Sequence, residues 1–262
     1  MTDSDSLPPI PLTGIACFFD LDGTLAGIEQ RPELVSIPDE IKQALCDIFT
    51  ATGGALALVS GRTLNELDTL SAPLHAPAAG VHGAERRDAQ GTLHRIELSP
   101  SVAATLQQQL TQAIAAMPGC HVEAKGMAFA LHYRGAEQFK DGILAVAQDF
   151  TRRYPELALQ PGKCVVELKP RGVNKGEAIK AFMNEAPFSG RTPLFIGDDL
   201  TDETGFTQVN ELNGITIKVG PGKTEARYHL ADVGKVHLWL LSLVKQQENY
   251  SIKTKISVGE DL

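Results

Sequence analysis

The sequence lacks the marks of a membrane, secreted or zinc-binding protein. Its apolar stretch near the C-terminus, HLWLLSLV, is far shorter than the roughly 18 residues of a membrane span. Its start, MTDSDSLPPIPL, is acidic and proline-rich, without the positive charge and apolar core of a signal peptide. The cysteines form no C-x-x-C pair, which argues against zinc or redox chemistry. We expect a cytoplasmic protein with reduced, buried thiols at Cys17, Cys46, Cys120 and Cys164.

Positive charge is also scarce. Lys and Arg together number 24 against 32 Asp and Glu, which gives a formal net charge of −8. Nucleic acids and anionic membrane surfaces bind basic patches, so neither is an expected partner. With 43% hydrophobic and 21% charged residues the chain is an ordinary globular protein. We expect a monomer that binds a small molecule, which can still be anionic because a local site can differ from the global charge.

Strands alternate with helices over residues 15–84 and again after residue 170. In the first segment the apolar strand IACFFD precedes a helix (IPDEIKQALCDIFTATGG), a strand (GALALVSGR), a helix (TLNELDTLSA) and a strand within PAAGVHGAE. In the second, helix NKGEAIKAFMNEA, strand TPLFIGDD, helix TDETGFTQVNEL and strand GITIKVG precede two helical segments, KTEARYHL and KVHLWLLSLVKQQ. The alternation predicts βαβ units and an α/β fold with a parallel sheet.

Between these segments the pattern changes to ββαββαββ. Hairpins are expected around residues 89–91, at Lys125-Gly126 and at Pro161-Gly162, with helices between them. This order predicts an antiparallel sheet with helices on one face. We therefore expect an α+β cap domain (85–170) inserted into a core domain (15–84 and 171–247), with a flexible N-terminal arm (1–14) and a loose C-terminal tail (248–262).

Acidic and hydroxyl side chains follow the predicted parallel strands. Asp20 and Asp22 follow the first strand, Ser60 follows the second, and Asp198 follows PLFIG. Ligands of open parallel sheets bind at the carboxyl ends of the strands, so these side chains should converge. A carboxylate can attack phosphorus, and a hard cation such as Mg²⁺ can bind carboxylate and phosphate oxygens together. The set therefore favours phosphoryl transfer.

Each of these residues has a predicted role. We expect Asp20 to attack phosphorus, Asp22 to act as general acid and base, and Lys175 to neutralise the charge that develops. Phosphate oxygens should be bound by Ser60, Gly61, Lys175 and Thr24. Metal ligands are expected from Asp20, Asp22, Asp198 and Asp199, with Asp202 behind them holding a metal-bound water. Which of Asp198 and Asp199 contacts the metal directly stays open.

Each motif also has a purely structural interpretation. DLDGT fits a turn closed by Asx hydrogen bonds, and GDD fits a helix N-cap. Arg62 in SGR can be a charge that starts a helix, and His82 can simply pack where the chain crosses between domains. The motifs occur in one order, each at a predicted strand or helix end, and this favours the chemical interpretation over chance.

The order D-x-D-G-T, S-G-R, K, G-D-D-x-x-D resembles the haloacid dehalogenase-type phosphatases. The stretches GVHGAERR, VEAKGMAFALHYR, VVELKPRGVNKGEAI and GDDLTDE are similar to the trehalose-6-phosphate phosphatase family, and the resemblance runs from Phe18 to about Glu203. It implies a Rossmann-like core with a cap, a Mg²⁺ cofactor, and hydrolysis of trehalose 6-phosphate through an aspartyl-phosphate.

The resemblance also implies that Glu123, Lys125 and Glu167 contact the glucose distal to the phosphate. His132 and Arg134 in LHYR are further candidates, because they share one alternation along a predicted strand. Glu-x-Lys pairs on strands also fit a solvated face of an antiparallel sheet, and His132 also fits a packed strand histidine.

Two other functions remain possible from the sequence. A different sugar-phosphate phosphatase or a sugar phosphomutase shares the D-x-D motif and a similar cap. A non-catalytic phospho-acceptor or sugar-sensing module is a third hypothesis. Asp22 argues against that module, because a phospho-acceptor that only stores phosphate needs no group to move protons.

Overall fold

The apolar segment Ile15–Phe19 forms strand β1, whose five residues are all buried. It lies inside an eight-stranded sheet with the order β12-β11-β10-β1-β2-β3-β4-β5. β1 pairs in parallel with β10 (Thr192–Gly197) on one side and with β2 (Leu56–Val59) on the other. A strand with parallel neighbours on both edges and helices over both faces has no polar side, which explains its continuous apolar sequence.

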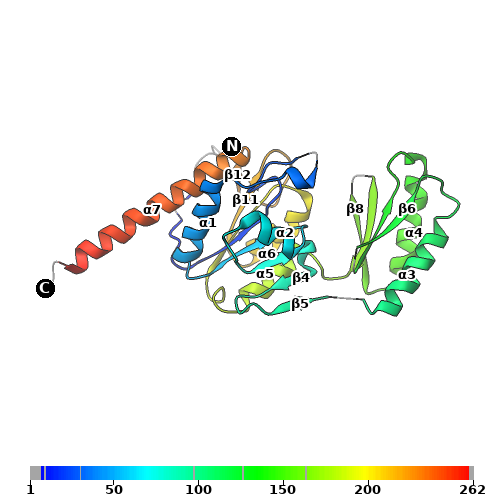
Figure 1. Ribbon diagram of the computed structural model, residues 1–262, viewed down its shortest axis with the longest axis horizontal. Coiled ribbons are helices and arrows are strands. Elements are labelled where there is room, and N and C mark those ends of the chain that lie inside the picture. Colours follow the sequence, from blue (N-terminus) through cyan, green and yellow to red (C-terminus); the bar gives the residue numbers. More distant parts are fainter. Residues whose placement is uncertain are drawn as a thin grey trace. The chain divides into compact units, whose positions relative to one another are not determined.

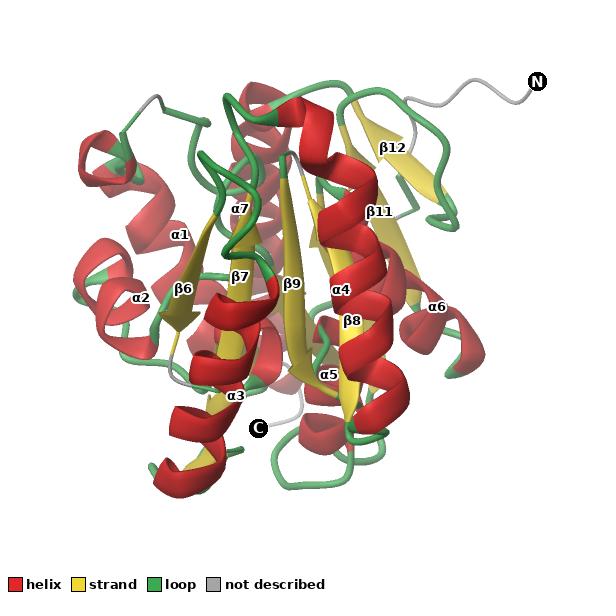
Figure 2. Cartoon of the chain, turned by 90° about the vertical axis from the view of Figure 1, so that its right-hand side faces the viewer, coloured by secondary structure: helices red, strands yellow, loops and turns green. Residues whose placement is uncertain are grey.

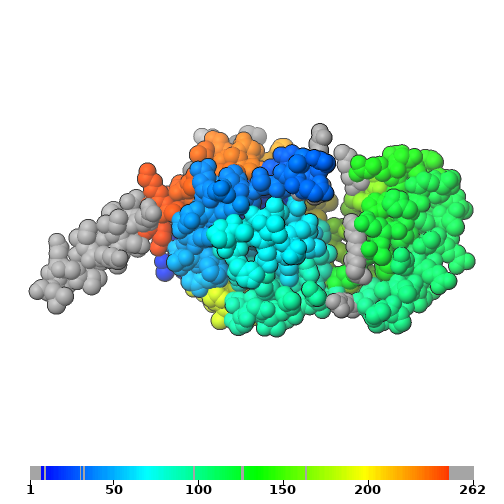
Figure 3. All heavy atoms as spheres, viewed as in Figure 1, coloured from blue at the N-terminus to red at the C-terminus, as the bar shows by residue number. Residues whose placement is uncertain are grey.

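The structure is a computed structural model that describes residues 7–8, 10–29, 31–96, 98–125, 127–162 and 164–259, without the side chains of residues 32, 125 and 248–259. It divides into two compact units, Met1–His94 with Asn174–Leu262, and Arg95–Val173 (Figure 1). The larger unit thus combines two separate segments of the chain, and its surface mixes blue and cyan with yellow and orange (Figure 3).

Helices cover both faces of the larger sheet. Phe19 points into a core that includes residues of α1 (Asp39–Ala51), α2 (Leu64–Ser71) and α7 (Val233–Gly259). Phe18, on the opposite face, points into a core with α5 (Lys175–Met183) and α6 (Glu203–Glu211). The arrangement is the three-layer α/β/α sandwich that the alternating pattern predicts, and it confirms the α/β fold class.

The remaining strands extend this sheet on both sides. β3 (Ala78–Gly80), β11 (Ile215–Val219) and β12 (Tyr228–Leu230) continue the parallel pairing, and β4 (Glu85–Arg87) runs antiparallel to β3, with β5 (Leu93–Arg95) beyond it. Short 3₁₀ helices form η1 (Pro32–Leu34), η2 (Val81–Gly83) and η4 (Leu200–Asp202). Phe19, the last residue of β1, pairs with Ile196 of β10 and with Leu58 of β2. The three central strands therefore end at the same edge of the sheet.

The smaller unit is an antiparallel sheet with helices on one face (Figure 2). Its strands are β6 (His121–Lys125), β7 (Ala128–His132), β8 (Leu157–Gly162) and β9 (Val165–Pro170), in the order β6-β7-β9-β8. Its helices are α3 (Pro100–Ala113), η3 (Glu137–Phe139) and α4 (Lys140–Arg153). Phe129, Leu131 and Leu168 form the core with α3 and α4, as the predicted α+β pattern requires.

The boundaries of the smaller unit differ from those expected from the sequence. Residues 85–94 were assigned to the cap, but β4 pairs with β3 and so belongs to the larger sheet. At the other end the smaller unit extends to Val173. The alternation of apolar and polar residues in a hairpin is the same in either sheet. The sheet that the hairpin joins depends on which strand pairs with its first strand, and the sequence pattern does not show that.

Two local predictions inside the units are wrong. Part of KTEARYHL forms the short strand β12 instead of a helix, because Ile217–Val219 offers a free parallel edge to Tyr228–Leu230. The third hairpin does not turn at Pro161-Gly162, since both residues belong to β8 and pair with Val166 and Val165. β8 is at the end of its sheet, where a proline is tolerated because the missing N–H costs no ladder hydrogen bond.

Both termini are more ordered than expected. Ile10 and Leu12 of the predicted arm are 4% and 2% exposed and pack into the core beneath α1 and α7. Helix α7 runs on to Gly259, through most of the predicted tail, because no proline or glycine lies between Gly234 and Gly259. Among the described residues, no helix combines the length and apolarity needed to cross a membrane.

Phe18 supports the strand that carries the candidate site, and its removal should destabilise the larger unit. The side chain is fully buried and stacks on Phe188 with ring centroids 5.5 Å apart. We expect Phe18→Ala to lower the free energy of unfolding by about 3–5 kcal/mol, because the cavity it leaves cannot collapse fully. Urea unfolding measures this, with Leu238→Ala, at a side chain 64% exposed, as the control expected within about 0.5 kcal/mol of the unmodified protein. Equal effects of the two changes would contradict it.

Candidate active site

Asp20 is the first residue after β1, and its carboxylate is buried beside Lys175. The Asp20 backbone N–H donates to the Ile196 carbonyl at 3.0 Å, which ties the end of β1 to β10. Lys175 Nζ donates to Asp20 Oδ1 at 2.8 Å and to Asp202 Oδ1 at 2.7 Å. Lys175 is the first residue of α5, where Asn174 caps the helix by accepting from Glu177 N. One lysine thus joins the first and last acidic motifs of the sequence.

Asp20, Asp198 and Asp202 form an acidic cluster, in which one carboxylate oxygen of each lies within 4.8 Å of the others. Burial is the main cause that raises their pKa values, to about 7 for Asp20, about 6 for Asp198 and about 8 for Asp202. Neighbouring carboxylates raise these pKa values further. Burial opposes the charge of Lys175, but Asp20 and Asp202 outweigh it and raise its pKa.

The chemistry of this cluster fits a divalent metal ion. Three carboxylates and one ammonium group leave a formal charge of −2 in a buried place. The donors are carboxylate oxygens, which hard divalent cations prefer. The cluster includes Asp202 itself, which the sequence placed behind the ligands.

Asp202 and Lys218 hold the loop that carries Asp198. Asp202 Oδ2 accepts from the backbone N–H groups of Asp198 and Asp199, each at 3.0 Å. Lys218 Nζ, from β11, donates to the Asp198 carbonyl and, at 3.1 Å, to the Val219 carbonyl. These contacts fix the backbone from which the Asp198 carboxylate reaches the cluster.

Asp22 and Asp199, both predicted as metal ligands, have their carboxylates engaged elsewhere. Asp22 forms a two-point ion pair with Arg62, with Nε–Oδ2 and Nη2–Oδ1 distances of 2.7 Å. Asp199 is the N-cap of η4, and its Oδ1 accepts from Thr201 N and Oγ1 at 2.8 and 2.6 Å. Those bonds lower the Asp199 pKa although burial opposes them. The structural interpretation of GDD as a helix N-cap is therefore correct for Asp199.

The predicted phosphate donors lie around the same sheet edge. Ser60 follows β2 and is buried, and its Oγ accepts from Arg62 N at 3.2 Å. Gly61 is exposed beside it. Thr24 is fully buried, and its hydroxyl has no hydrogen-bond partner among the described residues. Of these three residues, only Gly61 is exposed.

In the smaller unit, the sheet face away from α3 and α4 is polar. Ala130 pairs with Glu123 on one side and with Glu167 on the other, so all three residues share that face. His132 Nε2 lies 2.8 Å from Glu123 Oε2, and its ring stacks on that of His121 with centroids 4.7 Å apart. The small side chain of Ala130 therefore lies between the two glutamates.

The other two cap candidates are less defined. Lys125 is the last residue of β6, opposite Ala128, and its side chain lies outside the described residues. Arg134 follows β7 and is exposed. The histidine of LHYR therefore has a hydrogen-bonded place on the polar face, while the arginine lies beyond the end of the strand.

Two residues of the site were missed or undervalued from the sequence. Lys218 is a buried lysine in the otherwise apolar run ITIKV, and this break in the pattern was a usable signal. Arg62 was interpreted as a helix-starting charge, yet it binds a carboxylate 40 residues away. Nothing in the local spacing points to that partner.

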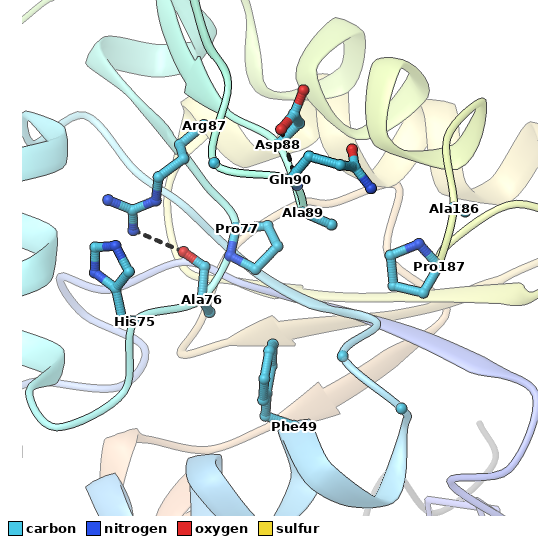
Figure 4. A pocket seen from close by; sticks show the side chains of 13 residues that line it. Phe49, His75, Ala76, Pro77, Arg87, Asp88, Ala89, Gln90, Ala186 and Pro187 are labelled. Carbon is cyan, nitrogen blue, oxygen red and sulfur yellow. Dashed lines mark hydrogen bonds between the residues drawn. The ribbon is translucent and has the colours of Figure 1, made fainter.

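A cavity of about 510 Å³ lies in the larger unit but not at the acidic cluster (Figure 4). Its walls include Gly54, Pro77 and Pro187, which precede β2, β3 and β10, so it opens at the amino ends of the strands. The Arg87 guanidinium in its wall is already bound by Asp68 and by the Ala76 carbonyl at 2.7 Å. The acidic cluster lies at the opposite edge of the sheet, which is therefore the candidate active site, and the cavity is not part of it.

A parallel sheet with an acidic cluster and a buried lysine at its carboxyl edge, together with an inserted α+β unit, is the fold of haloacid dehalogenase-like hydrolases. A haloacid dehalogenase-like hydrolase from Bacteroides thetaiotaomicron shares this fold, with a TM-score of 0.62 at 13% identity over 88% of this chain and 99% of its own. Trehalose-6-phosphate phosphatase from Aspergillus fumigatus gives a TM-score of 0.72 at 23% identity, over 88% of this chain and 92% of its own.

Sequence comparison then gives the family. The trehalose-phosphatase family model matches residues 18–234. Trehalose-6-phosphate phosphatase of Escherichia coli (strain K12) is 55% identical over 238 residues, which are 89% of this chain and 90% of that protein. A probable trehalose-phosphate phosphatase of Sinorhizobium fredii is 41% identical over 79% of this chain and 78% of its own. The chain belongs to the trehalose-phosphatase family.

Gly23 should tolerate no side chain. Its φ is +79°, and a Cβ at this position would overlap the Asp198 carboxylate. We expect Gly23→Ala to lower phosphatase activity by about 100-fold or more, because a 1 Å displacement of a reacting group costs that much. Steady-state kinetics measure this, with Gly27→Ala as the matched control, since no atom lies within 4 Å of a Cβ there. Wild-type activity in the Gly23 variant would disprove the steric argument.

Proposed function

We propose that this protein is a Mg²⁺-dependent phosphatase that hydrolyses trehalose 6-phosphate to trehalose and phosphate through an aspartyl-phosphate at Asp20. The observation that carries the proposal is the contact of Lys175 with both Asp20 and Asp202 inside a buried acidic cluster. Membership of the trehalose-phosphatase family and the named activity of its relatives support the substrate.

In the first step an oxygen of Asp20 attacks phosphorus, and the bond from phosphorus to the sugar oxygen breaks. The 2.8 Å bond from Lys175 holds one oxygen of the nucleophile, and its charge opposes the repulsion between two anions. Asp22 gives its proton to the departing sugar oxygen. In the second step Asp22 takes a proton from water, which attacks phosphorus and releases phosphate and the free Asp20 carboxylate.

Asp20 and Asp198 are the carboxylates we propose as Mg²⁺ ligands, with Asp202 orienting the loop and Lys175. When bound, the ion would supply positive charge that offsets the negative charge of the carboxylates and of the phosphate. The formal charge of −2 on the cluster and its raised pKa values support this assignment. Ser60 and Gly61 are proposed to donate to the remaining phosphate oxygens. Thr24 supports the turn after β1 through its backbone N–H, which donates to the Leu21 carbonyl at 3.2 Å.

The polar face of the smaller unit is proposed to bind the sugar. Glu123 and Glu167 offer carboxylate oxygens to sugar hydroxyls, and His132 holds the first of these in place. Lys125 and Arg134 are proposed as cationic partners at the ends of the same strands. A cytoplasmic location and a monomeric state stay predictions from the sequence.

Removal of the nucleophile should abolish turnover. We expect Asp20→Asn to lower phosphate release from trehalose 6-phosphate by at least about 1000-fold, since the attacking oxygen is lost. Chelation of Mg²⁺ should lower it comparably in the unmodified protein, and Mg²⁺ should restore it. Asp39→Asn, at a side chain 99% exposed on α1, is the control that should keep full activity. Higher rates with a hexose 1-phosphate, or stable phosphoprotein without turnover, would point to the mutase or the phospho-acceptor instead.

Glu167 should affect affinity for the sugar. We expect Glu167→Gln to raise KM for trehalose 6-phosphate about 10-fold, because a charge-assisted hydrogen bond contributes about 1.5–3 kcal/mol. Turnover of p-nitrophenyl phosphate, which has no sugar, should not change. Glu156→Gln, at an exposed glutamate before β8, is the matched control. If both substrates lost activity equally, Glu167 would not be a sugar contact.

A further inference from the structure

Both oxygens of the Asp22 carboxylate are bound by one guanidinium group. Arg62 Nε donates to Oδ2 and Nη2 to Oδ1, each at 2.7 Å. The arginine side chain is 12% exposed and the aspartate side chain 37% exposed. Parallel N–H donors on a planar fork fix the orientation of a carboxylate more strictly than a single point charge. The general acid and base proposed for this site is therefore held by a partner that is itself mostly buried.

A second acid holds the guanidinium from the other side. Arg62 Nη1 lies 3.8 Å from Glu66 Oε1, one helical turn further along. Glu66 is itself fixed, because its Oε2 accepts from Thr63 N at 2.9 Å and from Thr63 Oγ1 at 2.7 Å in a capping box. The Arg62 guanidinium therefore contacts the start of α2 as well as Asp22.

The backbone that carries Arg62 is braced by a strained turn. Val81 N donates to the Arg62 carbonyl and His82 N to the Ser60 carbonyl, both at 2.9 Å. Val81 and His82 have φ values of 48° and 56°, a left-handed conformation that costs roughly 1–2 kcal/mol for a residue with a Cβ. Strain of this kind persists where the surroundings impose it, often beside a functional site.

The loop that carries Arg62 packs closely against this turn. A Cβ on Gly61 would lie 2.8 Å from the His82 ring, and a Cβ on Gly80 would lie 2.8 Å from the Arg62 carbonyl. Glu85 Oε1 accepts from Leu64 N at 2.7 Å, which ties the next residues of the loop to β4. The backbone on both sides of Arg62 is therefore held by neighbouring segments of the sheet edge.

We propose that Arg62 is a positioning residue that acts through Asp22. The two N–H groups use one lone pair on each Asp22 oxygen and leave a second lone pair on each for the proton that moves to the sugar oxygen. The paired bonds keep the carboxyl group oriented for that transfer. The inference rests on the proposed function, because it needs Asp22 to move protons. Arg62 therefore affects the rate of only those steps in which Asp22 moves a proton.

The test compares two leaving groups. A sugar alkoxide is a strong base and needs a proton as it departs, whereas p-nitrophenolate is a weak base and departs without one. With enzyme in excess, we expect Arg62→Gln to slow cleavage of trehalose 6-phosphate by roughly 10–100-fold. Release of p-nitrophenolate in the same single-turnover experiment should slow by less than about 3-fold. In separate steady-state kinetics, KM for the sugar phosphate should stay within about 2-fold of the value for the unmodified protein.

Further variants keep the test valid if Arg62→Gln folds poorly. Arg62→Lys, which can bind only one oxygen, should give an intermediate and equally selective loss. Glu66→Gln keeps an N3 residue able to close the capping box while removing the charge beside Arg62, and should give a smaller loss of the same kind. In an Asp22→Asn background, Arg62→Gln should add less than about 2-fold. Arg31→Gln, at an exposed arginine, is the control with no loss.

The outcomes separate this inference from the proposed function. Equal losses with both leaving groups, or additive losses in the double variant, would mean that Arg62 binds phosphate and does not act through Asp22. A several-fold rise in KM for both substrates would mean the same. If the unmodified protein released phosphate from p-nitrophenyl phosphate but not from trehalose 6-phosphate, the proposed substrate would fail first.

Discussion

Lys175 places its one ammonium group between Asp20 and Asp202, two buried carboxylates that repel each other. Without this cation three acids would share a site from which water is largely excluded. With it, the formal charge falls to −2, which a divalent cation can neutralise. The lysine therefore sets both the orientation of the carboxylate after β1 and the charge that remains for a metal.

The loops around this contact are held by side chains that bind backbone groups. Asp202 binds two backbone N–H groups, Lys218 binds the Asp198 carbonyl, and His237 of α7 lies 2.8 Å from the Leu25 carbonyl. Each contact replaces solvent with a fixed hydrogen bond, so the loop atoms around the acidic cluster are held in place by the protein itself. The long helix α7 is thus part of the support of the site as well as of the core.

Sequence patterns anticipated the two-unit α/β and α+β architecture because they depend on local rules. Continuous apolar runs predicted the buried parallel strands, and alternation predicted the hairpins of the smaller unit. The errors occur where the structure depends on which strand pairs with which. β4 and β5 joined the larger sheet, and β12 formed beside the free edge of β11. Periodicity describes a face of an element, but it does not say which strand lies beside it.

The sequence by itself determined that Asp20, Ser60 and Asp198 meet at one sheet edge, because each follows a strand whose direction the βαβ pattern sets. Only the tertiary structure decided which carboxylates the cations hold: Lys175 binds Asp202 rather than standing apart from it, and Arg62 takes both oxygens of Asp22. These pairings depend on loop paths fixed by positive φ angles and by close packing, as at Gly23 and Val81. Such long-range geometry leaves no periodic signal in the chain.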